Sequence, residues 1–216
     1  MRIFLVLFFA AFVARSTAEE PKPTVTRIEL RDAGPNVLAD SFAAKPKVFY
    51  IAGTAYSRVE EQPDPKESIH GLIVINEPDC WIINLFGRTG QHVIDPGPTF
   101  VVHHRILGPK GPEEFSSFEY GKEIEFFREH HATPLEEQTL DGQRCEVSEF
   151  KHADYRVVLF VRRDTRKPFH LDVFKDGKNA FSTRYLSYQT GLPFDPALFR
   201  PPTDVSITEA KPKDGR

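Results

Sequence analysis

The segment from Ile69 to Phe86 constrains the fold more than any other part of the chain. Two largely apolar runs, Ile69–Ile75 and Cys80–Phe86, flank the turn-forming residues Asn76–Asp79, and this arrangement predicts a β-hairpin. Side chains alternate between the two faces of a strand, and an antiparallel strand with one face in water normally shows one polar face. This hairpin carries apolar residues on both faces. We therefore expect both faces to be covered, or one of them to line an apolar cavity, which favours ligand binding over catalysis.

The N-terminal residues predict export. Met1-Arg2 precedes the short apolar run Ile3–Val13, and the small residues Ser16 and Ala18 follow it, as in a secretory signal peptide that is cut after Ala18. We expect residues 1–18 to be this signal peptide and the mature protein to be periplasmic or secreted. An uncleaved membrane anchor is the less favoured alternative, because the apolar run is too short to span a bilayer and no later segment is long enough.

The composition predicts one exported domain that does not bind nucleic acid. The chain has 216 residues with 28 basic and 31 acidic side chains, and removal of the signal peptide leaves 198 residues with a small negative net charge. That length suits a single domain, and the charge does not favour nucleic acid or an anionic membrane surface. We expect one domain over residues 24–207, a disordered tail over 208–216, and a monomer without stable membrane insertion.

About ten β-like segments follow one another along the mature chain. Thr24–Arg31 alternates polar and apolar residues and is interpreted as an edge strand, and Lys47–Glu61 as one long strand with a bulge or bend at Gly53. So many strands in one flat sheet would leave long exposed edges and an uncovered face. We therefore predict a mainly β fold in which a large curved antiparallel sheet forms an unclosed barrel.

One helix interrupts the strands. Tyr120, Ile124, Phe127 and His131 are spaced by 4, 3 and 4 residues, which places them on one face of a helix. Pro134 ends the pattern. An apolar helix face and an apolar concave sheet face each need a cover, so we expect this helix to lie over the sheet as a lid.

Cys80 and Cys145 are the two cysteines of the chain. In an oxidising compartment we expect them to form a disulfide. Two buried free thiols on neighbouring strands are the alternative. A catalytic cysteine is least favoured, because no base or positive helix terminus is close in the sequence.

Motifs for catalysis and metal binding are weak. His103 and His104 lie on one expected strand, where neighbouring side chains point to opposite faces, and His130 and His131 end the expected helix. No H-E-x-x-H, G-x-S-x-G or glycine-rich phosphate loop occurs. We expect a protein that is not an enzyme and has no cofactor or metal. A metal-dependent enzyme that uses His103 or His104 with His130 or His131 is the least favoured alternative.

The candidate ligand-binding residues come from the hairpin and the helix. Arg58 is added because an arginine beside an apolar cavity would suit gating or a ligand head group, although an exposed arginine near Glu60 and Glu61 is the favoured alternative. The residues expected to line the cavity or its lid are Ile73, Ile75, Trp81, Ile83, Leu85, Tyr120, Ile124, Phe127 and Arg58.

Two blocks of sequence resemble a known group. Gly71, Pro78, Asp79 and Trp81 in the hairpin, and the run Leu192–Pro202, are similar to the LolA-like group of exported lipoprotein carriers. The resemblance implies an unclosed β-barrel with a helical lid over an apolar cavity that holds acyl chains. It does not transfer a gating arginine to Arg58, and the longer N-terminal helix typical of the group has no counterpart here.

These observations support one leading hypothesis. We expect an exported, non-enzymatic carrier or binding protein that holds an apolar or acylated ligand, such as a lipid or the acyl chains of a lipoprotein, in a concave β cavity. The alternative from another class is a structural or envelope interaction module whose interior is filled by its own side chains.

Overall fold

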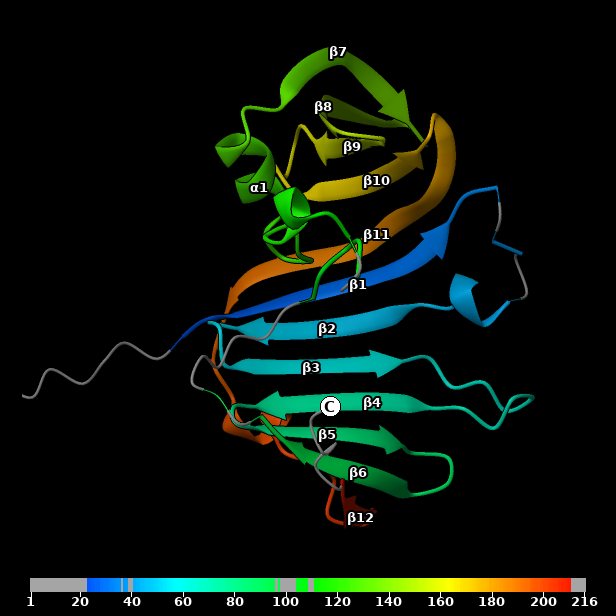
Figure 1. Cartoon of the computed structure of the whole chain (residues 1–216), viewed down its shortest axis with the longest axis vertical. Coiled ribbons are helices and arrows are strands. Elements are labelled where there is room, and N and C mark those ends of the chain that lie inside the picture. The colour runs from blue at the N-terminus through cyan, green and yellow to red at the C-terminus, as the bar shows by residue number, and fades with distance from the viewer. Residues whose placement is uncertain are drawn as a thin grey trace, which may run out of the picture.

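The computed structural model shows a mainly β protein in which one helix lies against an open sheet (Figure 1). It describes residues 23–35, 37–38, 41–95, 97, 104–108 and 111–210. The predicted signal peptide and residues 211–216 of the predicted tail lie outside this part of the chain. Among the described residues, no helix is both long and apolar enough to cross a membrane.

Strands make up most of the described chain, and the helical elements are short. The strands are β1 (Val25–Ala33), β2 (Lys47–Ala52), β3 (Tyr56–Glu61), β4 (Gly71–Asn76), β5 (Asp79–Asn84), β6 (Thr89–Ile94), β7 (Thr133–Leu140), β8 (Gln143–His152), β9 (Tyr155–Arg162), β10 (Pro168–Lys175), β11 (Lys178–Leu192) and β12 (Ser206–Glu209). The α-helix is α1 (Glu123–Glu129), and the 3₁₀ turns are η1 (Phe42–Ala44), η2 (Glu113–Phe115) and η3 (Pro196–Phe199).

The described strands form one sheet in the order β12-β6-β5-β4-β3-β2-β1-β11-β10-β9-β8-β7. Two meanders, β1–β6 and β7–β11, are joined because β1 pairs with β11. All neighbours are antiparallel except β12 and β6. The end strands β7 and β12 do not pair with each other, so the sheet stays open. The predicted mainly β, unclosed antiparallel sheet with a helix over it is confirmed.

The strand expected at an edge is central. β1 lies between β2 and β11, and Val25, Ile28 and Leu30 are almost completely buried. Its polar residues Arg27 and Glu29 face the side opposite Ile28 and Leu30, which is the side of Val25, and form an ion pair at 2.9 Å. A central strand with one solvated face has the same alternation as an edge strand, so the pattern alone did not place it.

The expected long strand Lys47–Glu61 is a hairpin. β2 and β3 pair with each other from Ala52 and Tyr56 outward, and Gly53 lies in the turn with φ of +58°. Glycine adopts this left-handed conformation without steric cost, so the residue interpreted as a bulge or bend is part of a reversal of the chain.

The two faces of the sheet have different covers. We call inner the face that carries Ile28, Phe49, Val59, Leu159 and Leu171, because the segment 104–132, which includes α1, packs on it (Figure 1). We call the opposite face outer. On the inner face, Phe115, Phe118 and Phe126 from this segment are almost completely buried in one cluster with strand residues.

The C-terminal segment covers part of the outer face. Phe199 of η3 packs with Val25 and Ala52, and Ile207 of β12 packs with Ile83 and its neighbours on β4. This segment therefore covers the part of the outer face that carries Ala52, Leu72 and Ile83, and the last two are apolar side chains of the hairpin.

The predicted disulfide is wrong, since both cysteines are free thiols. Cys80 lies on β5 and Cys145 on β8, and the seven strands from β4 through β9 in the sheet order separate them. Bridged cysteines have Cα atoms within about 7 Å of each other, whereas β5 and β8 lie near opposite ends of the sheet (Figure 1).

Candidate ligand-binding surfaces on the inner face

A strip of apolar side chains crosses the inner face of β4, β5 and β6. Ile73 pairs across the strands with Ile82, and Ile75 with Cys80, which in turn pairs with Val93. Cross-strand partners share a face of a sheet. These five residues, here called the inner strip, therefore lie side by side on the face that also carries Val59 and Phe49.

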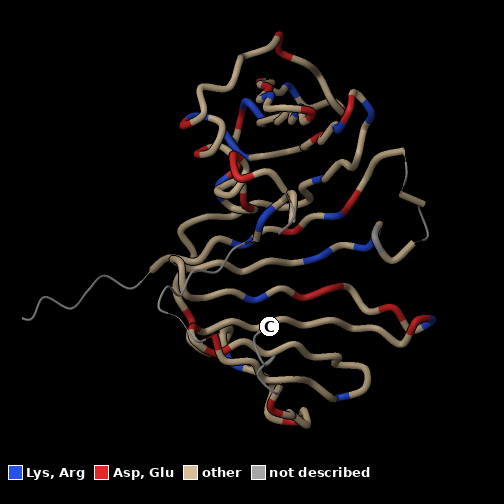
Figure 2. Tube along the Cα trace, in the orientation of Figure 1, with Lys and Arg blue, Asp and Glu red and all other residues tan. Residues whose placement is uncertain are grey.

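Burial falls along the inner face from the centre toward β6. Phe49 and Val59 are covered, whereas Ile73 is 38% exposed and Ile82 is 51% exposed. Among the described elements, the segment 104–132 reaches the face of β3, where His104 hydrogen-bonds Ser57 at 2.5 Å. Figure 2 shows that β4 and β5 are also largely free of charge. The inner strip is thus an apolar surface beside a filled core.

A second concave surface lies beside α1. One hollow of about 310 Å³ is lined by Phe127 of the helix and by Leu159 and Val161 of β9. A second, of about 350 Å³, is lined by Lys167 and by Tyr188 of β11. Both hollows share Ile124 and Arg128, so together they form one groove along the exposed side of the helix. We call it the α1 groove.

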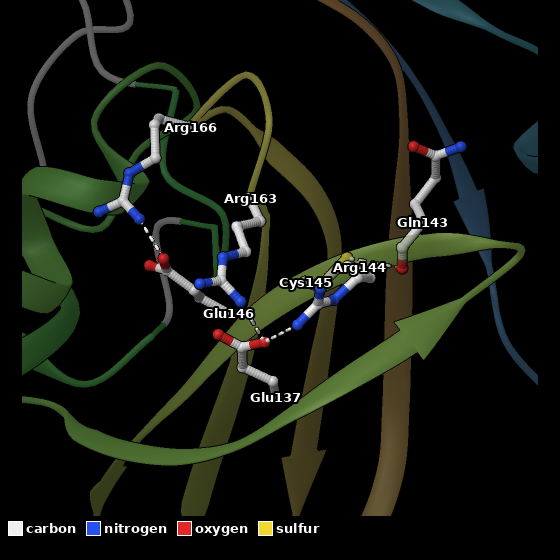
Figure 3. Close-up of polar contacts among 7 residues, drawn as sticks. All are labelled: Glu137, Gln143, Arg144, Cys145, Glu146, Arg163 and Arg166. Carbon is white, nitrogen blue, oxygen red and sulfur yellow. Dashed lines mark hydrogen bonds and ion pairs between the residues drawn. The ribbon is translucent and has the colours of Figure 1, made fainter.

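Ion pairs border the α1 groove near β8. Arg166 pairs with Glu146, and Arg163 and Arg144 both pair with Glu137, at 2.9 and 3.0 Å (Figure 3). Because these groups are exposed, the pairs add little to stability. The carboxylate of Glu137 is shared by two arginines.

A buried carboxyl group holds the start of α1 on the sheet. Glu123 is fully buried and accepts hydrogen bonds from the hydroxyls of Tyr185 at 2.9 Å and Tyr188 at 3.0 Å. Burial raises the pKa of Glu123 above its usual value. Tyr188 also lines the α1 groove, so this network connects the groove with the interior.

The structure divides the predicted hairpin residues between the two faces. Ile73 and Ile75 lie in the inner strip, whereas Ile83 and Trp81 pair with Leu72 and Val74 on the outer face. There Trp81, Ile83 and Leu85 pack in the cluster that includes the C-terminal segment.

The remaining predicted residues are also separated. Tyr120 and Phe127 belong to the inner core, while Ile124 is 41% exposed and lines the α1 groove. Arg58 lies on the outer face opposite Val74, and its guanidinium pairs with Glu60 at 2.8 Å.

The histidines interact with protein groups. The ring of His130 stacks on Phe126 with centroids 4.0 Å apart, and its Nδ1 lies 3.0 Å from the carbonyl oxygen of Phe126. His104 bonds Ser57, and His103 lies outside the described residues. Within the described ranges, no three His, Cys, Asp or Glu residues are grouped so that they could hold a metal ion.

A hollow of about 510 Å³ on the outer face is polar. Tyr50, Glu60 and His70 line it, and Glu60 is already paired with Arg58 and, at 3.2 Å, with His70. Its lining suits polar groups and not an apolar ligand.

Solved structures match this chain at low sequence identity. An uncharacterized conserved protein from Thermus thermophilus matches with a TM-score of 0.50 and 10% identity, over 87% of this chain and 91% of that chain. The MucA/MucB complex of Pseudomonas aeruginosa matches with a TM-score of 0.44 and 10% identity, over 86% of this chain and 58% of that chain. An outer membrane lipoprotein-sorting protein domain from Vibrio parahaemolyticus matches with a TM-score of 0.35 and 12% identity, over 83% of this chain and 92% of that chain.

A lipoprotein-sorting domain is among these structural neighbours. No protein-family model and no curated protein matches the sequence. At these identities the likeness to the Thermus protein shows the fold and does not identify a ligand.

Proposed function

We propose that the protein is an exported, non-enzymatic carrier or binding protein for an apolar or acylated ligand, which lies against the inner strip. The observation that carries this proposal is the exposure of Ile73 and Ile82 on a face whose other half is packed as core. Contiguous exposed apolar surface on a soluble protein commonly marks a binding site. The sequence of residues 1–18 supports export.

The energetics of the strip suit a reversible carrier. Full burial of an isoleucine or valine side chain contributes about 1.5–3 kcal/mol. Ile73, Ile82 and Val93 are 38%, 51% and 36% exposed, so covering what remains exposed would contribute about 1 kcal/mol each. An acyl chain would add the burial of its own methylene groups, at about 0.8 kcal/mol apiece.

Titration with a fluorescent fatty-acid probe tests the proposal. The double variant Ile73→Ser/Ile82→Ser should bind the probe at least tenfold more weakly than the unmodified protein. The matched control is Leu186→Ser/Ile94→Ser, which replaces two residues outside the strip of similar exposure, 45% and 58%. Equal affinity of all three proteins, or no binding of the probe by the unmodified protein, would refute the assignment of the strip.

A second candidate function rests on the filled interior. Phe118 and Phe126, with ring centroids 4.7 Å apart, occupy the space between the lid and the sheet together with Phe115. This packing favours a structural or envelope interaction module over a carrier with a deep cavity. If the inner strip binds a protein, cross-linking from a residue in the strip should capture that protein while the probe does not bind.

A further inference from the structure

The α1 groove is built differently from the inner strip. Its first hollow has an apolar floor made by Phe127, Leu159 and Val161, and Ile124 stands exposed at its margin. Its second hollow is polar, with Lys167, Tyr188 and Thr190 in its lining. The inner strip has no such division, because its exposed residues are all apolar or a cysteine.

Cations outnumber acids around the groove. Four basic side chains line the two hollows, against two carboxylates; the basic residues are Lys122, Arg128, Arg166 and Lys167, and the acids are Glu125 and Glu146. Lys122 is held by Glu119 at 2.8 Å and Arg166 by Glu146. Arg128 is exposed and lies 3.8 Å from Glu125 and 3.9 Å from Glu129.

Lys167 is the cation best placed to receive a ligand. Its ammonium group donates a hydrogen bond to the Thr190 hydroxyl at 2.7 Å and lies 5.7 Å from the centre of the Tyr188 ring. No carboxylate among the described residues pairs with it. An ammonium has three donors, so two remain for an anionic group in the second hollow.

We infer that the α1 groove binds a single-chain amphiphile with an anionic head, of the kind represented by a long-chain fatty acid. The chain lies on the apolar floor of the first hollow, and the carboxylate lies in the second hollow against Lys167, with Arg128 beside it. This inference deepens the proposed function and rests on it, since both assign apolar or acylated ligands to the protein. It adds a second site and a head-group charge.

The structure favours one chain and a negative head for two reasons. The first hollow has a volume of about 310 Å³, near the lower end of ligand pockets. The ammonium group of Lys167, which pairs with no carboxylate among the described residues, favours an anion over a cation. The groove lies over β9 and β11, whereas the inner strip lies on β4–β6, so the two surfaces do not share residues.

Calorimetric titration with dodecanoate, its methyl ester and dodecyltrimethylammonium tests the inference on the purified protein. We expect dodecanoate to bind most tightly, the ester more weakly and the cation weakest. Lys167→Gln should reduce dodecanoate affinity roughly tenfold, the size expected for one charge-assisted hydrogen bond, and leave ester affinity unchanged. Ile124→Gln should weaken both ligands.

Lys178→Gln is the matched control, because Lys178 is an exposed lysine at the β10–β11 turn, away from the groove. It should change neither affinity. Thermal unfolding of each variant checks that the fold is kept. Equal binding of dodecanoate and its ester, or no loss of dodecanoate affinity in Lys167→Gln, would overturn the inference.

The two proposals fail separately. If Ile73→Ser/Ile82→Ser loses the fluorescent probe while Lys167→Gln and Ile124→Gln bind dodecanoate normally, the carrier function stands and the groove site is wrong. If the groove variants lose dodecanoate while the strip variant binds every ligand normally, the groove is the ligand site and the strip is not.

Discussion

Ile82 and Ile83 are neighbours in β5 with opposite surroundings, and replacing each with alanine separates the two faces of the hairpin. Ile83 is 3% exposed and packs with Leu72, Val74 and the C-terminal segment. Ile82 is 51% exposed on the inner strip. The chemical change is the same in both variants, so a difference in stability reports the difference in cover.

The size of each effect follows from burial. Ile83→Ala leaves a cavity in a packed cluster, and such substitutions cost about 2–5 kcal/mol of unfolding free energy. Ile82→Ala removes three carbon atoms worth about 0.8 kcal/mol each if fully buried. Half of that side chain is already in water and no closed cavity forms, so its cost should be about 1 kcal/mol.

Urea denaturation of the purified protein measures the difference. With a slope of about 2 kcal/mol per molar urea, the midpoint of Ile83→Ala should lie at least about 0.5 M below that of Ile82→Ala. The fatty-acid probe should bind Ile82→Ala more weakly and a folded Ile83→Ala normally. Equal destabilisation by the two variants would mean that the inner face of β5 is covered, and the reasoning would be wrong.

Three further predictions concern titratable groups and thiols. Burial raises the pKa of Glu123. The contribution of Glu123 to stability is therefore complete below its unfolded pKa of about 4.3 and is lost as the pH rises through its folded pKa. Between mildly acidic and neutral pH, the urea midpoint of Glu123→Gln should vary less than that of the unmodified protein. The carboxylate of Glu209, opposed in part by burial, raises the pKa of His92. The unfolding free energy lost in His92→Gln should therefore be largest in mild acid and should shrink as the pH rises through the folded pKa of His92. A loss that stays constant across that pH range would contradict this prediction. Cys80 and Cys145 are free, so iodoacetamide should alkylate both thiols of the denatured, unreduced protein, and mass spectrometry should detect two labels. A protein without labels would show that the two cysteines form a disulfide.

Local patterns predicted most of the fold. The alternation of the strands predicted the open sheet, and the spacing of apolar residues predicted a helix over it. The predicted helix face was wrong, because α1 begins after Tyr120 and buries Phe126 and Phe127, while Ile124 is 41% exposed. The hairpin faces were harder. Ile73 pairs with Ile82 and Ile75 with Cys80, so residues of odd and even number share a face, and the sequence alone left this register open.

Long-range pairing was not predictable from local signals. β1 pairs with β11, and this contact places Cys80 and Cys145 near opposite ends of the sheet. Nothing in the residues around either cysteine encodes that distance. Polar residues on the outer face of β1 likewise made a central strand resemble an edge.

The candidate site was predicted in part. Ile73, Ile75 and Ile124 lie on the surfaces that we assign to ligands. Lys167 was missed, because its role depends on where the β9–β10 turn meets β11. The apolar run Val157–Val161 was a usable signal, since a strand apolar on both faces requires a second cover.

Extraction of the protein with organic solvent, after purification from the compartment to which it is exported, tests the central claim most directly. Mass spectrometry of the extract should find an apolar or acylated molecule in a fixed ratio to the protein, and the Ile73→Ser/Ile82→Ser variant should carry less of it. A ligand-free extract from a protein that also fails to bind the fatty-acid probe would contradict the claim that the inner strip is a carrier surface.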